Sequence, residues 1–289
     1  MKKYVYSFIN GTAEGSSAMN NLLGGKGANL AEMTNLSIPV PPGFTITTEV
    51  CVYFMQHNKF PPGLKKQVLA EIQKIELYMN KKFGDSQNPL LFSVRSGARQ
   101  SMPGMMETVL NIGLNTETSI GLIKKTGNPR FVYDSFRRLL MMYADVVMEK
   151  SNQKVNINNS GIRIQLDKIL EKVKHENNCK HDSDLDATTL QRLCHTFKGE
   201  IIKKFNASFP ETPVDQLWGA IHAVFQSWNG KRAIDYRNIE NIPHTWGTAV
   251  NIQAMVFGNM GNSSATGVVF TRNPSTGERK IFGEWLKNA

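Results

Sequence analysis

Hydrophobic residues recur at helical spacing in two segments of the chain. The first stripe consists of Leu64, Val68, Ile72, Ile75 and Met79. The second consists of Leu217, Ile221, Val224, Phe225 and Trp228. A stripe with this period covers one face of an α-helix. The pattern predicts two amphipathic helices, and we expect the first, of roughly 15 residues, to pack on a sheet.

Other segments have the patterns of β-strands. Short apolar or β-branched runs occupy 44–47, 90–95, 267–270 and 280–285. In 250–257, Val250 and Ile252 alternate with Asn251 and Gln253, which is typical of a strand with two different faces. The run 90–95 is expected to be a buried strand that brings Arg95 to the sheet edge. Strands and helices in one chain predict a mixed α/β (α+β) fold.

The middle of the chain has a different pattern. From about residue 115 to 212 the apolar positions are mostly helical, for instance Phe136, Leu139, Leu140, Tyr143, Val146 and Val147, and a polar stretch follows around 150–160. Strand alternation returns only at Val250. We therefore expect a helical insert over 115–212.

Composition indicates an ordinary globular protein with a basic balance. The chain has 289 residues, of which 40% are hydrophobic and 20% charged, and its net charge is +10. A basic chain can bind nucleic acid by releasing counterions from the phosphate backbone. Here the basic pairs, such as Lys65-Lys66 and Lys203-Lys204, are scattered and no aromatic stripe accompanies them. A phosphate-rich small ligand accounts for the charge equally well, so no nucleic-acid partner is expected.

The sequence predicts neither a cysteine-based site nor a membrane segment. Cys51, Cys179 and Cys194 are far apart and form no CxxC pair, so no disulfide framework or zinc site is indicated. No apolar run approaches the roughly 20 residues that cross a bilayer. Met1–Tyr6 is interrupted too soon by polar residues for a signal peptide. We expect a cytoplasmic protein without a membrane partner.

Two glycine- and cation-rich segments are candidates for phosphate binding. Gly24–Gly27 contains Lys26 and comes just before a helical pattern, and backbone N–H groups at a helix start favour an anion. It is not a P-loop, and a Gly-Lys-Gly turn is also common without any ligand. Ser93–Arg99 places two guanidiniums among small residues, which suits bidentate phosphate contacts or a structural ion pair. The Met102–Met106 loop that follows is more typical of core filling.

Two loops toward the C-terminus have residues suited to phosphate binding, although a structural role is a common alternative for such loops. Gly261–Gly267 is a small-residue loop fit to wrap phosphates, and Thr271–Glu278 adds a guanidinium and a carboxylate. Loops of this kind are also ordinary hairpin connections. The segment Gly247–Val256 is, by pattern alone, a strand.

Together these segments resemble the pyruvate phosphate dikinase family over the whole chain. The segments that carry the resemblance are Leu22–Met33, Ser93–Arg99 with Ser101–Asn111, Lys125–Phe131, Gly247–Gly258 and Val269–Glu278. The related phosphoenolpyruvate synthases, which are water dikinases, share the Gly-Lys-Gly and Val-Arg-Ser elements. Their loop after the arginine does not resemble Ser101–Met106, so that loop favours the dikinase.

The resemblance implies an ATP-grasp fold, in which two α/β subdomains clamp ATP. The implied division is 1–114 with 213–258 as the first subdomain, 115–212 as the helical insert, and 259–289 as the start of an incomplete second subdomain. Lys26 and Arg95 match the family's phosphate-binding lysine and arginine. The strand containing Gln253, Met255 and Val256 resembles the hinge whose backbone meets adenine.

The remaining candidates by resemblance lie in the last 31 residues. Ser264, Thr266 and Gly267 resemble the phosphate loop of the second subdomain. Glu278 and Glu284 are the acidic candidates nearest that loop, with a surface salt bridge as the alternative. No catalytic residue and no metal ligand is expected within this chain.

The family's reaction interconverts ATP, phosphate and pyruvate with AMP, diphosphate and phosphoenolpyruvate, using Mg²⁺ and a carrier histidine. The expected ligands are therefore ATP, Mg²⁺ and phosphate, with pyruvate and phosphoenolpyruvate reached only through domains outside this chain. No histidine here lies in the carrier motif, so the chain alone is expected to be inactive. A homodimer is consistent with the family. The alternatives are a nucleotide-binding module that transfers no phosphate and a water dikinase.

Overall fold

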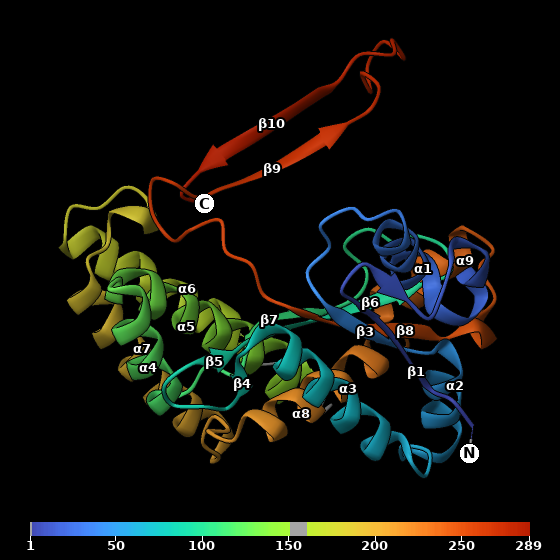
Figure 1. Cartoon of the computed structure of the whole chain (residues 1–289). Coiled ribbons are helices and arrows are strands. Elements are labelled where there is room, and N and C mark those ends of the chain that lie inside the picture. The colour runs from blue at the N-terminus through green and yellow to red at the C-terminus, as the bar shows by residue number, and fades with distance from the viewer. Residues whose placement is uncertain (1, 151–160) are drawn as a thin grey trace.

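A computed structural model describes residues 2–150 and 161–289 (Figure 1). The strands are β1 Val5–Ile9, β2 Thr12–Ala13, β3 Gly43–Ile46, β4 Lys82–Phe83, β5 Pro89–Leu90, β6 Phe92–Ala98, β7 Thr108–Ile112, β8 Thr248–Ala254, β9 Ala265–Phe270 and β10 Phe282–Lys287. The helices are α1 Asn20–Asn35, α2 Thr48–His57, α3 Leu64–Met79, α4 Thr116–Thr126, α5 Pro129–Tyr143, α6 Ile162–Glu176, α7 Ala187–Phe205, α8 Pro213–Ser227 and α9 Lys231–Ile239. Short helical turns are η1 Ser17–Met19, η2 Ala144–Glu149, η4 Asp182–Asp184 and η5 His244–Trp246.

A six-stranded antiparallel sheet forms the centre of the molecule, in the order β2-β1-β3-β8-β6-β7. The mixed α/β prediction is confirmed. The two amphipathic stripes form α3 and α8, as their spacing predicts. β6 lies between β8 and β7, so the expectation that its strand brings Arg95 to the sheet edge is wrong. A short run of apolar residues cannot distinguish an inner strand from an edge strand, because pairing partners come from distant segments.

Strand alternation separates the two faces of the sheet. Phe44, Val94 and Ile252 are directly paired, fully buried and part of the hydrophobic core. Helices α2, α3 and α8 cover this face, while α1 lies on the opposite face (Figure 1). The polar residues between these positions therefore point toward α1.

Helices account for all regular structure in the described residues between 115 and 212. Helix α5 packs against β7 on one side and α7 on the other, and its Phe131, Leu139 and Leu140 join the same core as the sheet. Of the polar stretch expected around 150–160, residues 151–160 lie outside the described residues. The division of the chain into subdomains stays a prediction, because one continuous core joins these helices to the sheet.

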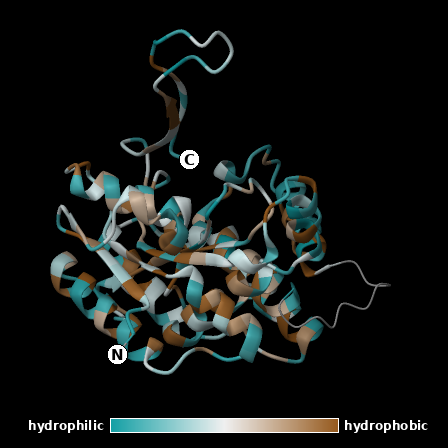
Figure 2. Cartoon of the chain, turned by 90° about the vertical axis from the view of Figure 1, so that its right-hand side faces the viewer, coloured by the Kyte–Doolittle hydropathy of each residue, from teal (hydrophilic) through white to brown (hydrophobic). Residues whose placement is uncertain are grey.

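The last strands form a separate two-stranded hairpin, β9–β10. It extends away from the sheet (Figure 1), and every residue of both strands is exposed. Figure 2 shows an apolar stretch on the hairpin, outside the body of the molecule. Val268 and Val269 of β9 are exposed. Within the described part of the chain, no helix combines the length and the apolarity needed to cross a membrane.

Candidate functional site

Four polar residues form a row across the sheet beneath α1. Thr45 on β3 and Arg95 on β6 both pair with Asn251 on β8, and Arg95 also pairs with Thr108 on β7. Directly paired residues point to the same face of a sheet, so these side chains lie side by side. The Thr45 hydroxyl donates a hydrogen bond to Asn251 Oδ1 over 2.8 Å in a buried environment. The register thus fixes the position of Arg95 in the middle of a rigid strand.

Glycines allow α1 to lie directly on this row. Gly24 has a φ of 66° and a ψ of 166°, which interrupts the helix just before Lys26. A Cβ atom at Gly24 would lie 1.7 Å from the carbonyl oxygen of Gly97, and one at Gly27 would lie 2.8 Å from a side-chain carbon of Thr45. No other residue fits such distances or readily adopts that conformation of Gly24. The Gly24–Gly27 segment is therefore a close-packing contact that holds Lys26 against β6.

Among the described residues, the hydrogen bonds of the Lys26 and Arg95 side chains go to neutral groups. Lys26 Nζ donates to the Ser96 carbonyl oxygen over 2.8 Å, and the Arg95 guanidinium donates to Gln253 Oε1. Within residues 2–150 and 161–289 the Nε of Arg95 is buried without a partner. Two neighbouring cations without a counter-ion favour the arrival of an anion.

The pKa values of Lys26 and Arg95 are both lowered from their ordinary values. Burial lowers the pKa of Lys26, and the positive charge of Arg95 lowers it further. Burial also lowers the pKa of Arg95. Each shift means that the charged form is less well stabilised at this site than in water. A bound phosphate would relieve both effects.

A cavity of about 640 Å³ opens beside this pair, and we refer to it as the Lys26 cavity. It is lined by Gly25, Lys26, Asn29, Leu30 and Met33 from α1, by Arg95, Ser96, Gly97 and Ala98 from β6, by Gln100–Gly104 and Met106, and by Thr108. The lining contains two cations, several hydroxyl and amide groups, and no carboxylate. Its size and chemistry suit a small organic phosphate. The Met102–Met106 loop is partly core filling, since Met102 is buried, and partly cavity wall.

The residues present do not fit a magnesium site. Among the described residues no three acidic, histidine or cysteine side chains gather in one place, and the Lys26 cavity supplies no anionic oxygen ligand. Hard divalent cations in proteins take oxygen ligands, commonly carboxylates. The described residues therefore offer no ligand set for a metal ion, and Mg²⁺ stays a prediction.

The predicted adenine hinge is only partly a strand. β8 ends at Ala254, so Met255 and Val256 follow the strand instead of continuing it. The Met255 amide donates to the Leu91 carbonyl over 2.9 Å, and Val256 is 68% exposed. The side chain of Gln253 accepts from Arg95 and donates to the Pro41 carbonyl over 2.9 Å. The contact of this segment with adenine stays a prediction, while Gln253 acquires a second role in orienting Arg95.

The predicted residues of the second subdomain lie on the hairpin, apart from Lys26 and Arg95. Ser264 sits in a turn, its amide donating to the Gly261 carbonyl, and Thr266 Oγ1 donates to the Ala289 carbonyl over 3.2 Å. Gly267, Glu278 and Glu284 are exposed, and none of the five lines the Lys26 cavity. Figure 1 shows the hairpin extending away from the sheet. Their proposed part in phosphate binding stays a prediction.

Two features of the site were not anticipated from the sequence. Asn251 is fully buried beneath Gly27 and Gly97, and its Nδ2 has no partner in the described part of the chain. The only signal for it was a polar residue at an alternate position of a strand. The Arg99 guanidinium lies 5.3 Å from the centre of the Trp246 ring, a cation–π contact between segments far apart in sequence.

The fold and this cavity define an α/β domain that presents two neighbouring cations, Lys26 and the half-buried Arg95, on one face of an antiparallel sheet. Comparison with known proteins makes the class specific. The chain belongs to the family described as pyruvate phosphate dikinase, AMP/ATP-binding domain, whose model matches residues 20–68 and 60–284.

Curated relatives cover essentially the whole chain. It is 51% identical over 291 residues to pyruvate, phosphate dikinase of Clostridium symbiosum, of which it covers 32%. It is 50% identical to the enzyme of that name from Rhizobium meliloti, covering 31%, and 49% identical to a chloroplastic one from Oryza sativa, covering 29%. The chain thus spans about a third of the length of these relatives.

Proposed function

We propose that this chain is the ATP-binding part of a pyruvate phosphate dikinase, with Lys26 and Arg95 as its phosphate-binding residues. The observation that carries the proposal is a pair of neighbouring cations, without a counter-ion among the described residues, beside a cavity of about 640 Å³. The guanidinium can engage two phosphate oxygens at once, whereas the ammonium acts as a compact point charge. Both are held by packed elements before the ligand arrives, which is the arrangement that electrostatic stabilisation of phosphoryl groups requires.

The same proposal includes the dikinase reaction of the whole enzyme. In the whole enzyme, phosphoryl transfer from ATP would continue through a carrier histidine to pyruvate, and Mg²⁺ stays an expected ligand of that enzyme. That this chain alone completes no turnover stays a prediction. Ser264, Thr266, Gly267, Glu278 and Glu284 would approach the phosphates from the second subdomain. The same proposal includes the division into subdomains, a cytoplasmic location, phosphate as a partner and a homodimer.

Binding of ATP to the purified chain tests the assignment. We expect Arg95→Met and Lys26→Met each to weaken binding by about tenfold or more, since a hydrogen bond to a charged group contributes about 1.5–3 kcal/mol. Lys66→Met removes an exposed cation on α3 and should leave affinity unchanged. Equilibrium dialysis with labelled ATP gives the three constants. If Arg95→Met bound ATP within about threefold of wild type, the assignment of the phosphate site would be wrong.

The second candidate function is a nucleotide-binding module that transfers no phosphate. An experiment on the whole polypeptide that contains this chain distinguishes the two candidate functions. Incubation with β-labelled ATP and magnesium should leave acid-labile phosphate on a histidine outside residues 1–289 if the dikinase proposal holds. Tight ATP binding without any phosphoprotein would favour the module.

A further inference from the structure

The Lys26 cavity is walled in part by a loop that contains no helix or strand. Residues 99–107 connect β6 to β7, and we refer to them as the 99–107 loop. Most of this loop lines the cavity. Met102 is buried in the hydrophobic core, whereas Ser101 and Pro103 on either side of it are exposed. Because a loop lacks the repeated backbone hydrogen bonds of a helix or a strand, its shape depends on contacts with neighbouring elements.

Arg99 holds the first end of the loop. Its carbonyl oxygen accepts a hydrogen bond from Asn20 Nδ2 of α1 over 3.1 Å. Its guanidinium carbon lies 5.3 Å from the centre of the Trp246 ring, within the range of a cation–π contact. Arg99 Nε is buried and has no hydrogen-bond partner among the described residues. The guanidinium is thus held mainly by the face of the Trp246 ring.

Trp246 is a fixed platform, because η5, which ends at this residue, is bound to the core. Trp228 Nε1 donates to the His244 carbonyl over 2.9 Å, and Arg237 Nε donates to His244 Nδ1 over 3.0 Å. Trp228 and Arg237 are 2% and 1% exposed. Two buried side chains therefore fix η5, and through Trp246 they fix the side chain of Arg99.

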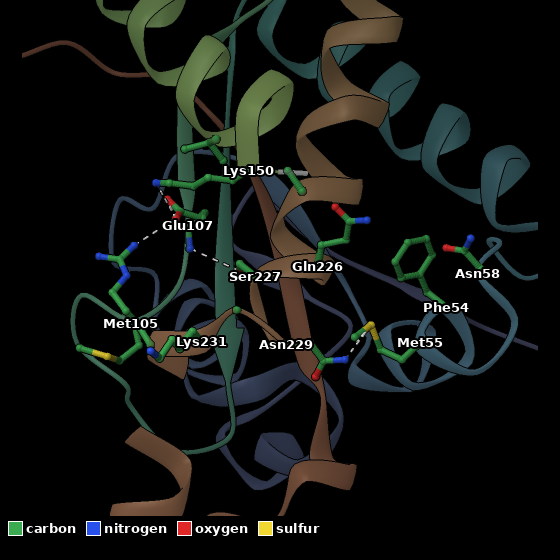
Figure 3. Close-up of a pocket in the computed structure, with 14 residues that line it drawn as sticks. Phe54, Met55, Asn58, Met105, Glu107, Lys150, Gln226, Ser227, Asn229 and Lys231 are labelled. Carbon is green, nitrogen blue, oxygen red and sulfur yellow. Dashed lines mark hydrogen bonds and ion pairs between the residues drawn. The ribbon is translucent and has the colours of Figure 1, made fainter. Parts of the chain in front are cut away.

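Glu107 holds the other end of the loop (Figure 3). Its backbone amide donates to Ser227 Oγ at the end of α8 over 3.4 Å. Its carboxylate pairs with Lys150 over 3.0 Å and with Arg232 over 3.3 Å, and Lys150 is held in turn by Asp145, 2.9 Å away. The Glu107 side chain is 17% exposed, so these charge pairs are less screened by solvent than pairs on the open surface. The two ends of the loop are therefore bound to different parts of the molecule.

We propose that Arg99 and Glu107 are positioning residues, which hold the loop between them as a preformed wall of the Lys26 cavity. This role rests on the proposed function, because the wall affects ATP only if ATP binds in this cavity. Neither Arg99 nor Glu107 lines the cavity, so neither touches the ligand. A wall that is ordered before binding spares the complex the entropy cost of ordering it. Loss of either anchor therefore weakens binding without removing a contact to the ligand.

The order of the loop can be measured without any ligand. In the 289-residue chain labelled with ¹³C on its methionine methyl groups, Met102 reports on the loop and Met33 reports on the cavity wall formed by α1. Arg99→Leu should move the Met102 signal toward that of an exposed methionine and leave the Met33 signal unchanged. Trp246→Leu should do the same, because it removes the ring on which the guanidinium rests. Thermal melting confirms that each variant is folded.

The affinity for ATP, from equilibrium dialysis, measures the consequence for binding. Arg99→Leu and Trp246→Leu should each weaken binding by about fivefold or more, and the double variant should be no weaker than either, since both changes remove one contact. Arg99→Lys keeps a cation over the ring and should bind within about twofold of wild type. Glu107→Gln removes the charge pairs at the other end and should weaken binding by about threefold or more.

A matched control is Lys65→Leu, which breaks another cation–π contact, 6.0 Å from Lys65 Nζ to the ring of Trp218, and should change neither the Met102 signal nor the affinity.

The proposal is overturned if Arg99→Leu leaves the Met102 signal of the ligand-free chain unchanged, or if it moves that signal while ATP binds within about twofold of wild type. It is also overturned if Arg99→Leu weakens binding and Trp246→Leu does not, because Arg99 would then contact the ligand directly. If the proposed function alone is wrong, Arg95→Met binds ATP as well as wild type does, while Arg99→Leu still moves the Met102 signal. That result supports the anchors and contradicts only the ATP site.

Discussion

The α1 face of the sheet and the β9–β10 hairpin carry the two halves of the predicted nucleotide site in contrasting surroundings. On the α1 face, Lys26, Arg95 and Gln253 are held by strand register, glycine contacts and hydrogen bonds to neighbouring groups. On the hairpin, Thr266, Gly267 and Glu284 lie on exposed strands. The contrast teaches that only the first half is positioned by packing within this chain. Preorganisation, the main source of electrostatic stabilisation, is therefore found at Lys26 and Arg95.

The largest expected effect breaks the packing on the α1 face. Gly24→Ala should destabilise the fold by about 1–3 kcal/mol more than Gly247→Ala, because its new Cβ would clash with the Gly97 carbonyl. Gly247 is a matched control with φ 64° and ψ −172°, and its Cβ would meet nothing closer than 3.2 Å. Urea unfolding of both variants measures the difference. Equal destabilisation would mean that backbone strain alone, and no close contact, requires Gly24.

A smaller effect is expected inside the polar row. Thr45→Val removes the donor to Asn251 Oδ1 and leaves a buried acceptor unpaired, which should cost about 1–3 kcal/mol. Thr47→Val is the control, since the buried Thr47 hydroxyl has no partner in the described residues, and this change should be neutral or stabilising. Unfolding in urea compares the two. The role of the row is contradicted if both variants lose the same stability.

The lowered pKa of Lys26 predicts opposite pH responses for binding and stability. As pH rises through the lowered pKa toward the ordinary value of 10.5, Lys26 loses its charge and ATP affinity should fall several-fold. In the same window the unfolded chain binds more protons, so the contribution of Lys26 to stability rises with pH. Lys26→Arg keeps its charge and should give a flatter affinity curve. Identical pH curves for wild type and Lys26→Arg would exclude titration of Lys26 as the cause.

The smallest effect is expected on the hairpin. Glu278→Gln and Glu284→Gln change exposed side chains and should alter the free energy of unfolding by less than about 0.5 kcal/mol. Urea unfolding of the 289-residue chain checks this. A loss comparable to that of Thr45→Val would show that the hairpin is packed in solution, and the comparison between the two regions would fail.

Much of the fold followed from local patterns, but the site followed only in part. The spacing of apolar residues in α3 and α8 was enough to predict both helices, because burial of one face imposes that period. The backbone of α1 approaches β6 closely, and this approach requires glycines. Those glycines made the motifs around Lys26 and Arg95 recognisable in the sequence. The pairing of Arg95 with Asn251 joins segments more than 100 residues apart, and no local pattern encodes it. The same holds for the Arg99–Trp246 contact.

A crystal structure of the chain with a non-hydrolysable ATP analogue tests the central claim most directly. The account predicts phosphate oxygens within hydrogen-bonding distance of both Lys26 Nζ and the Arg95 guanidinium, with Arg95 reoriented from Gln253 toward the ligand. An analogue bound with its phosphates elsewhere, and Lys26 still donating to the Ser96 carbonyl, would contradict it.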